Sequence, residues 1–134
     1  MFAESISTLP SFLTYFAIAV AILAAFLFVY VNFTPYREIA LIREGNAAAA
    51  VSLSGTLLGF ALPVANVIEN SHSLVDLGLW STIACVVQLL IYLVARATLP
   101  QLAEDIPAGK MAPAIFLAAL SVSAGLINAA CMEY

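Results

Sequence analysis

The chain has 134 residues, of which 64% are hydrophobic and only 9% are charged. Soluble domains are about half apolar and about a quarter charged, and a chain of this length cannot bury such an apolar excess in one globular core. The composition therefore predicts a single domain in a lipid bilayer, covering residues 1–134. The net charge of −4 argues against a nucleic-acid partner, which would require clustered lysine and arginine side chains.

Four apolar stretches follow one another along the chain, at approximately residues 11–33, 46–68, 74–97 and 110–132. Each has about 20 apolar or small residues, the length of a helix that crosses a hydrocarbon core of about 30 Å. Only helices and closed barrels satisfy their backbone polar groups in lipid, and these stretches lack the two-residue alternation of barrel strands. We therefore expect an all-α membrane protein with four transmembrane helices. No lysine or arginine precedes the first stretch, so we expect a retained helix rather than a cleaved signal peptide.

Two links of similar plan carry the basic residues, namely residues 34–45 (TPYREIALIREG) and residues 98–109 (TLPQLAEDIPAG). Each begins with threonine, contains proline and acidic side chains, and ends with glycine; the first is expected to form a short interfacial helix. All four basic residues lie in or beside these links: Arg37, Arg43, Arg96 and Lys110. Since basic residues favour the cytoplasmic side in short loops, we predict that both links are cytoplasmic and both termini periplasmic.

The two halves of the chain resemble each other when one is shifted by 64 residues, which aligns FLFVYVNFT with LIYLVARAT and Gly45 with Gly109. This predicts a tandem repeat of two-helix hairpins, with the first unit at about residues 11–70 and the second at about residues 75–134. Two helices return the chain to its starting side, so the units would be parallel and related by an axis along the membrane normal.

The second helix of each predicted hairpin is rich in small residues. In the second and fourth apolar stretches, the residues predicted to pack helices are Ser52, Gly55, Gly59, Ala119 and Ser123. Small residues let helix backbones approach closely in lipid, where no hydrophobic force drives helices together. We therefore expect helices two and four to form the inner contact and a homo-oligomer to assemble through them, with helices one and three facing more lipid. The alternative is that glycine and alanine are simply common in membrane helices.

Polar side chains are few in the predicted helices, and each has two interpretations. Gln88, near the middle of the third helix, forms either an interhelical hydrogen bond or part of a pathway lining, and the hydrogen bond is favoured. Asn66 and Asn128 lie toward the outer ends of helices two and four and are expected to cap or cross-link them.

The densest polar cluster follows the second helix and comprises Asn66, Glu69, His72 and Asp76. It could bind a cation, or sense periplasmic pH through His72, because histidine titrates near neutrality. The favoured interpretation is a solvated loop.

Signatures of enzymes and of bound cofactors are absent from the sequence. One histidine permits no HExxH motif, and neither GxSxG nor a glycine-rich phosphate loop is found. Cys85 and Cys131 lie in apolar runs without metal-binding spacing, which is typical of free cysteines. We therefore expect no catalytic residue, no cofactor and no metal.

Several segments resemble a known bacterial family: EIALIREGN at residues 38–46, SLSGTLLGFALP, IACVVQLLIYLVAR and GLINAACMEY. Over essentially its whole length the chain resembles the inner-membrane family known as domain of unknown function 350. The resemblance implies a bacterial inner-membrane location and a two-helix unit that is often present twice. It also implies genes nearby for phage-shock-type membrane-stress proteins and ATP-grasp ligases. In the second unit the Gly-Asn pair is replaced by Gly109 and Lys110, which leaves open whether both units keep one role.

Two functions remain open from the sequence. The favoured one is an oligomerising component of an envelope or membrane-stress complex, with membrane-stress proteins as partners. The alternative is a subunit of an oligomeric channel or transporter, in which Gln88, Asn66 or Asn128 would line the pathway.

Overall fold

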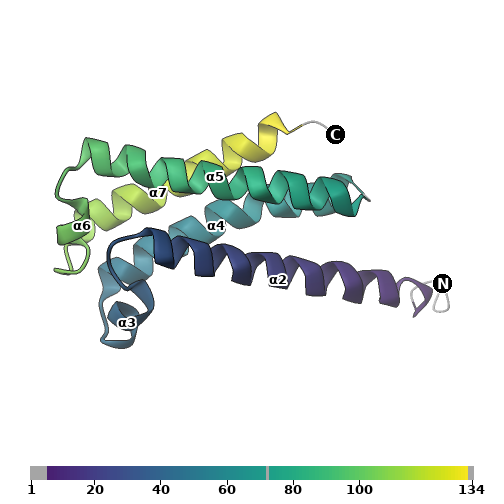
Figure 1. Cartoon of the computed structure of the whole chain (residues 1–134), viewed down its shortest axis with the longest axis horizontal. Helices are drawn as coiled ribbons and strands as arrows, with labels where there is room; N and C mark the ends of the chain where they lie inside the picture. Colours follow the sequence, from purple (N-terminus) through teal and green to yellow (C-terminus); the bar gives the residue numbers. More distant parts are fainter. Residues whose placement is uncertain (1–5, 72, 133–134) are drawn as a thin grey trace.

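The computed structural model describes residues 6–71 and 73–132. Its helices, labelled as in Figure 1, are α2 (Leu9–Phe33), α3 (Glu38–Arg43), α4 (Ala47–Asn70), α5 (Leu74–Thr98), α6 (Leu102–Asp105) and α7 (Met111–Cys131). The described residues contain no strand, and α2, α4, α5 and α7 are long and apolar enough to cross a membrane. The prediction of an all-α membrane protein with four transmembrane helices is confirmed.

The short helices α3 and α6 lie together at one end of the molecule, whereas α2 begins and α7 ends at the opposite end (Figure 1). The four long helices run back and forth between these two ends, as four membrane crossings require. We call them the α3/α6 end and the far end. Gly45 and Gly109, which precede α4 and α7, adopt φ angles of 90° and 83°. Glycine reaches this left-handed region without steric cost, so each link can turn sharply into the next long helix.

Asn46 fixes the start of α4 and also joins the two links. Its side-chain oxygen accepts a hydrogen bond from the Ala49 amide at 3.0 Å, which caps the helix. Its side-chain nitrogen donates to the carbonyl oxygens of Ile106 and Pro107, both at 3.1 Å. The residue after Gly45 therefore connects the first hairpin to the second.

Helices α4 and α7 make the most extensive contact in the molecule, and their backbones nearly touch. A Cβ atom on Gly59 would overlap the Ser121 carbonyl group, and one on Gly125 would overlap the backbone of Gly59. A Cβ atom on Gly55 would overlap Ala118. Glycine is needed here because the helix axes lie too close for any side chain between them. We call this contact the α4–α7 seam.

Helix α2 packs along the edge of the bundle and buries little of its surface (Figure 1). Its buried residues are Phe26 and Tyr30, both in its second half. The ring of Phe26 stacks on that of Phe60 in α4, with centroids 4.0 Å apart and planes 3° apart. Helices one and three were expected to be the more exposed pair: α2 is indeed the least buried of the four long helices and α4 the most buried, but α5 is more buried than α7.

Candidate functional site

The small residues predicted for helix packing fall on two different surfaces. Ser52, Gly55 and Gly59 are buried in α4, where the two glycines form one side of the α4–α7 seam. Ala119 and Ser123 are exposed on α7. The residues of α7 that meet the glycines of α4 are Ala118, Ser121 and Gly125.

The difference has a simple geometric cause. The buried residues of α7 recur every three or four positions and form one stripe: Ala114, Leu117, Ser121 and Gly125. Successive residues are about 100° apart around a helix, so Ala119, two positions from both Leu117 and Ser121, points to the opposite side. The shift of 64 residues finds equivalent positions in two helices, but it does not tell which face each helix turns to its neighbour.

Gln88 and Asn66 both donate hydrogen bonds to the backbone of α7. The side-chain nitrogen of Gln88 lies 3.1 Å from the carbonyl oxygen of Ser121, and that of Asn66 bonds the carbonyl oxygen of Ala129. Both side chains therefore cross-link helices, as interhelical polar groups in membranes commonly do. The side-chain oxygen of Gln88 and the side-chain nitrogen of Asn128 are buried without a partner among the described residues.

Within the described residues, the predicted polar cluster at the far end belongs to the turn between α4 and α5. Asp76 accepts a hydrogen bond from the Ser71 hydroxyl at 2.7 Å, and the Ser73 hydroxyl caps α5 by accepting from the Asp76 amide at 3.3 Å. Glu69 is exposed, and His72 lies outside the described residues. No group of side chains suited to a metal ion occurs in the part of the chain that the structure describes.

The sequence analysis missed the most buried charged residue. Glu38, the first residue of α3, is only 1% exposed. Its carboxyl oxygen accepts a hydrogen bond from the Thr34 hydroxyl at 2.7 Å, and the Thr34 amide in turn caps the end of α2 by bonding the Tyr30 carbonyl at 3.1 Å. Glu38 forms no ion pair, because Lys110 with Asp105 is the one salt bridge among the residues described.

Three buried tyrosines lie beside Glu38. The ring centroid of Tyr92 in α5 is 6.1 Å from that of Tyr30 in α2 and 6.4 Å from that of Tyr36 in the link. The Tyr92 hydroxyl is buried and has no partner of good hydrogen-bond geometry within residues 6–71 and 73–132. We call Glu38, Thr34 and the three tyrosines the Glu38 cluster. It joins α2, α3 and α5 at the α3/α6 end.

Burial shifts the pKa values of Glu38 and Tyr36 in the cluster. Removal from water raises the pKa of Glu38 from 4.5 to about 7, even though the Thr34 hydroxyl and the backbone amide of Glu38 stabilise the charged form. Burial also raises the pKa of Tyr36 well above its usual range, and the neighbouring Tyr92, Tyr30 and Glu38 add to this effect. Near neutral pH the Glu38 carboxyl group is therefore protonated far more often than an exposed glutamate, while Tyr36 keeps its proton.

A row of polar atoms continues from the cluster into the middle of the bundle. The Thr56 hydroxyl lies 3.3 Å from the hydroxyl of Tyr30 and 3.3 Å from that of Ser121. Ser121 in turn accepts the bond from Gln88. Helices α2, α4, α5 and α7 all contribute to this row, which we call the polar row.

Two features of the sequence mark Glu38, although neither indicates that it is buried. It opens the EIALIREGN segment, and it follows Tyr36 by two positions. The residue 64 positions later, in the second link, is Leu102, which is also buried but apolar. The second link therefore has no acidic residue at the position that corresponds to Glu38.

Comparison with known proteins identifies the family. Residues 4–132 match the model of the Domain of Unknown Function (DUF350), and the chain belongs to this family. It is 38% identical over 129 residues to the UPF0719 inner membrane protein YjfL of Escherichia coli (strain K12), a match that covers 96% of this chain and 98% of the relative. It is 30% identical over 91 residues to the UPF0719 transmembrane protein YshE of Bacillus subtilis (strain 168), covering 68% of each. No solved structure matches. The predicted membership is thus confirmed, and four apolar helices fit a multi-pass inner-membrane protein.

Proposed function

We propose that this member of the DUF350 family is a non-enzymatic, assembling component of an inner-membrane complex, and that it forms homo-oligomers through the outer side of α4 and α7. One observation carries the proposal. A groove of about 570 Å³ runs between the two helices on their exposed side. Its lining is dominated by small side chains: Ala50, Ser54, Gly55, Ala118 and Ala119.

The groove is suited to a helix of a second copy. Leu58 and Ile115 border it and are 60% and 54% exposed, so each copy presents both a depression and the bulky side chains that can fill one. Two copies related by a two-fold axis bring the same patch together from both sides. Small residues on a lipid-facing surface favour this packing because close approach gains van der Waals contact that lipid chains do not provide.

The test is the copy number of the purified protein in lipid nanodiscs, measured by native mass spectrometry. Ala119→Leu fills the groove without reaching the α4–α7 seam, and we expect it to reduce the assembly to a monomer. Ala17→Leu makes the same change on the exposed surface of α2 and should leave the copy number unchanged. A monomeric wild type, or an Ala119→Leu variant with the wild-type copy number, would refute the proposed interface.

We propose membrane-stress proteins as partners of this assembly, on the basis of the family resemblance. Cross-linking in living cells, followed by purification of the wild type and of Ala119→Leu, tests this part separately. Recovery of phage-shock-type proteins with the wild type supports a stress complex. Their absence from both samples would contradict it while leaving the homo-oligomer untouched.

A second candidate, a subunit of an oligomeric channel or transporter, is favoured by the polar row. Its atoms come from all four long helices, and Gln88 has a free carbonyl oxygen at the end of the row. Gln88→Leu removes this end, so ion flux into proteoliposomes should fall relative to the wild type. Equal flux in the two samples would argue against the row as a pathway.

The proposal includes a tandem duplication and an orientation. Helices α3 and α6 begin 64 residues apart, as do α4 and α7, and the glycines before the latter pair share a positive φ. The basic residues at the α3/α6 end favour a cytoplasmic location for that end and periplasmic termini. A reporter that is active only in the periplasm, fused after Tyr134, should be active; an inactive fusion would reverse the orientation.

A further inference from the structure

We propose that the Glu38 carboxyl group is a proton-binding site, which exchanges its proton with water at the α3/α6 end when the cover formed by Tyr30, Tyr36 and Tyr92 opens. In the exchange, the carboxylate takes a proton from a hydronium ion and leaves a carboxylic acid and a water molecule. This inference does not depend on the assembly proposed above, since the groove and the Glu38 cluster lie on different helix faces.

No basic side chain among the described residues forms an ion pair with the Glu38 carboxyl group. Glu38 is 1% exposed, and its carboxyl group receives hydrogen bonds from neutral donors, the Thr34 hydroxyl and the Glu38 backbone amide. A buried carboxylate without a cation is costly, and such a group binds a proton instead. A proton also needs no cavity, which suits a site filled by aromatic rings.

The elements that pack around Glu38 bring only a few titratable groups to the site. Helix α2 contributes Tyr30, the link contributes Tyr36, and α5 contributes Tyr92 and, near Tyr92, Arg96; Arg37 directly precedes Glu38 in the chain. Both arginines are exposed, and neither forms an ion pair with Glu38. Helix α4 carries a single acidic residue, Glu69, near its far end, and no basic one. The titratable groups that face the carboxyl group are therefore neutral phenols. Since none of them carries a positive charge, binding a proton is what neutralises the carboxylate.

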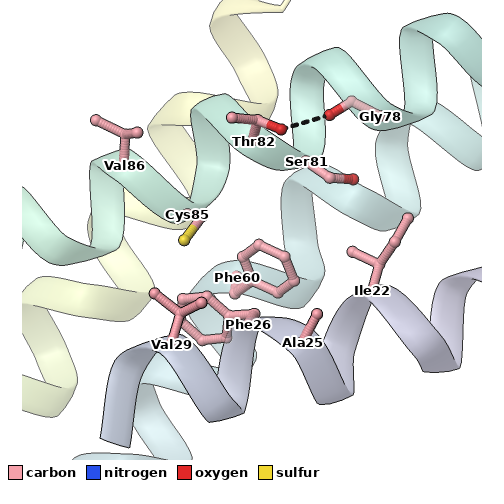
Figure 2. A pocket seen from close by; sticks show the side chains of 10 residues that line it. All are labelled: Ile22, Ala25, Phe26, Val29, Phe60, Gly78, Ser81, Thr82, Cys85 and Val86. Carbon is pink, nitrogen blue, oxygen red and sulfur yellow. Dashed lines mark hydrogen bonds between the residues drawn. The ribbon is translucent and has the colours of Figure 1, made fainter. Parts of the chain in front are cut away.

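Helix α2, which carries Tyr30 of the cover, has space to move relative to α5. Helix α2 fully buries only Phe26 and Tyr30, its other core contacts are partly exposed, and a cleft of about 340 Å³ lies between α2 and α5 around Phe26. Figure 2 shows this cleft, with Phe26 and Phe60 facing each other at its floor and Ser81 and Cys85 on the α5 side. A small displacement of α2 would separate Tyr30 from Tyr92 without disturbing the α4–α7 seam.

The experiment is a carbon-13 NMR titration of glutamate side chains in the full-length protein, labelled at the carboxyl carbon and held in nanodiscs. Glu38→Gln identifies the signal of Glu38, and Glu44→Gln provides a matched control because Glu44 is exposed at the end of α3. We expect the signal that Glu38→Gln removes, and that Glu44→Gln keeps, to titrate with a midpoint near pH 7.

A second variant keeps the test decisive if Glu38→Gln does not fold. Thr34→Val keeps the shape of the side chain but removes the hydrogen bond that stabilises the carboxylate, so it should raise the midpoint of Glu38. A Glu38 midpoint below about 6, or no titration up to about pH 9, would overturn the proposal. A midpoint that moves with sodium or potassium concentration would assign the site to an alkali cation and would also overturn it.

Discussion

The α4–α7 seam and the attachment of α2 show two ways of holding helices together in a membrane. At the seam, glycines bring two backbones into contact, and hardly any side chain intervenes. Helix α2 has the larger apolar side chains but buries only Phe26 and Tyr30 of them, and it meets the bundle through aromatic rings and the Glu38 cluster. In lipid, small residues rather than large apolar ones mark the closest contacts, because an exposed phenylalanine costs nothing there.

The largest effect should come from adding a side chain to the seam. Gly59→Val places methyl groups where the Ser121 carbonyl and the Gln88 amide now lie, and the backbones must separate. We expect a loss of at least about 3 kcal/mol, at the upper end of the cost of overpacking, seen as failure to purify a folded protein or a large drop in its unfolding temperature.

Gly78→Val is the matched control for this prediction. It lies in α5, is exposed, and a Cβ atom there would meet nothing within 4 Å. It should change the unfolding temperature little, since β-branched residues differ from glycine in a helix by only a few tenths of a kcal/mol. If both variants were equally unstable, the seam would be no more tightly packed than the outer surface.

The next largest effect should be a pH dependence of stability that comes from the Glu38 cluster and not from the α4–α7 seam. The pKa of Glu38 rises from 4.5 in the unfolded chain to about 7 in the folded one, so folding is favoured when the group is protonated. Below about pH 4.5 the group is protonated in both states and its ionisation costs no stability. Between pH 4.5 and about 7 ionisation favours the unfolded chain, and above pH 7 the full cost of roughly 3 kcal/mol is present.

Unfolding temperatures measured from about pH 5 to pH 8 check this sign. The wild type should become less stable as pH rises, and Glu38→Gln should lose most of that dependence. Glu44→Gln should keep it, because Glu44 is exposed. Equal pH profiles for the wild type and Glu38→Gln would show that the carboxyl group is not buried in the folded protein.

The positions of the long helices could be predicted from sequence, but the Glu38 cluster could not. The stretches predicted at residues 46–68 and 74–97 correspond to Ala47–Asn70 and Leu74–Thr98, because the bilayer sets both the length and the composition of a spanning helix. Glu38, by contrast, occupies a link whose other acidic residue, Glu44, is exposed. Glu38 and Glu44 differ in burial only because of the way α3 folds against the bundle. The contact between α3 and the bundle joins parts of the chain that are distant in sequence.

The small-residue pattern was informative only for α4. Gly55 and Gly59 are the only glycines of the second stretch, so they marked the seam directly. The fourth stretch has small residues on several faces, and composition alone could not choose between Ala119 and Ala118. That choice depends on the rotation of α7 about its axis, which packing against α4 and α5 determines.

A smaller effect should come from the contact between the links. Asn46→Ala removes the cap of α4 and two bonds to the second link, so it should destabilise the protein by about 1–2 kcal/mol. Lys110→Ala changes the equivalent position, where the side chain makes no cap and only a 3.5 Å ion pair with Asp105. Its cost should stay below about 1 kcal/mol, and a larger loss than in Asn46→Ala would contradict the assigned role of Asn46.

The smallest effect concerns the attachment of α2 itself. Phe26 is 3% exposed and stacks on Phe60, whereas Phe28, two positions later, is 71% exposed. Because lipid replaces much of what Phe26→Ala removes, the loss should be only about 1 kcal/mol, close to the value of the aromatic pair alone. Spin labels on α2 and α5 should nevertheless report a wider and broader distance distribution in Phe26→Ala and no change in Phe28→Ala. If both variants kept the wild-type distribution, the Glu38 cluster rather than the stacked rings would hold α2, and the pH dependence of the same distance would then reveal it.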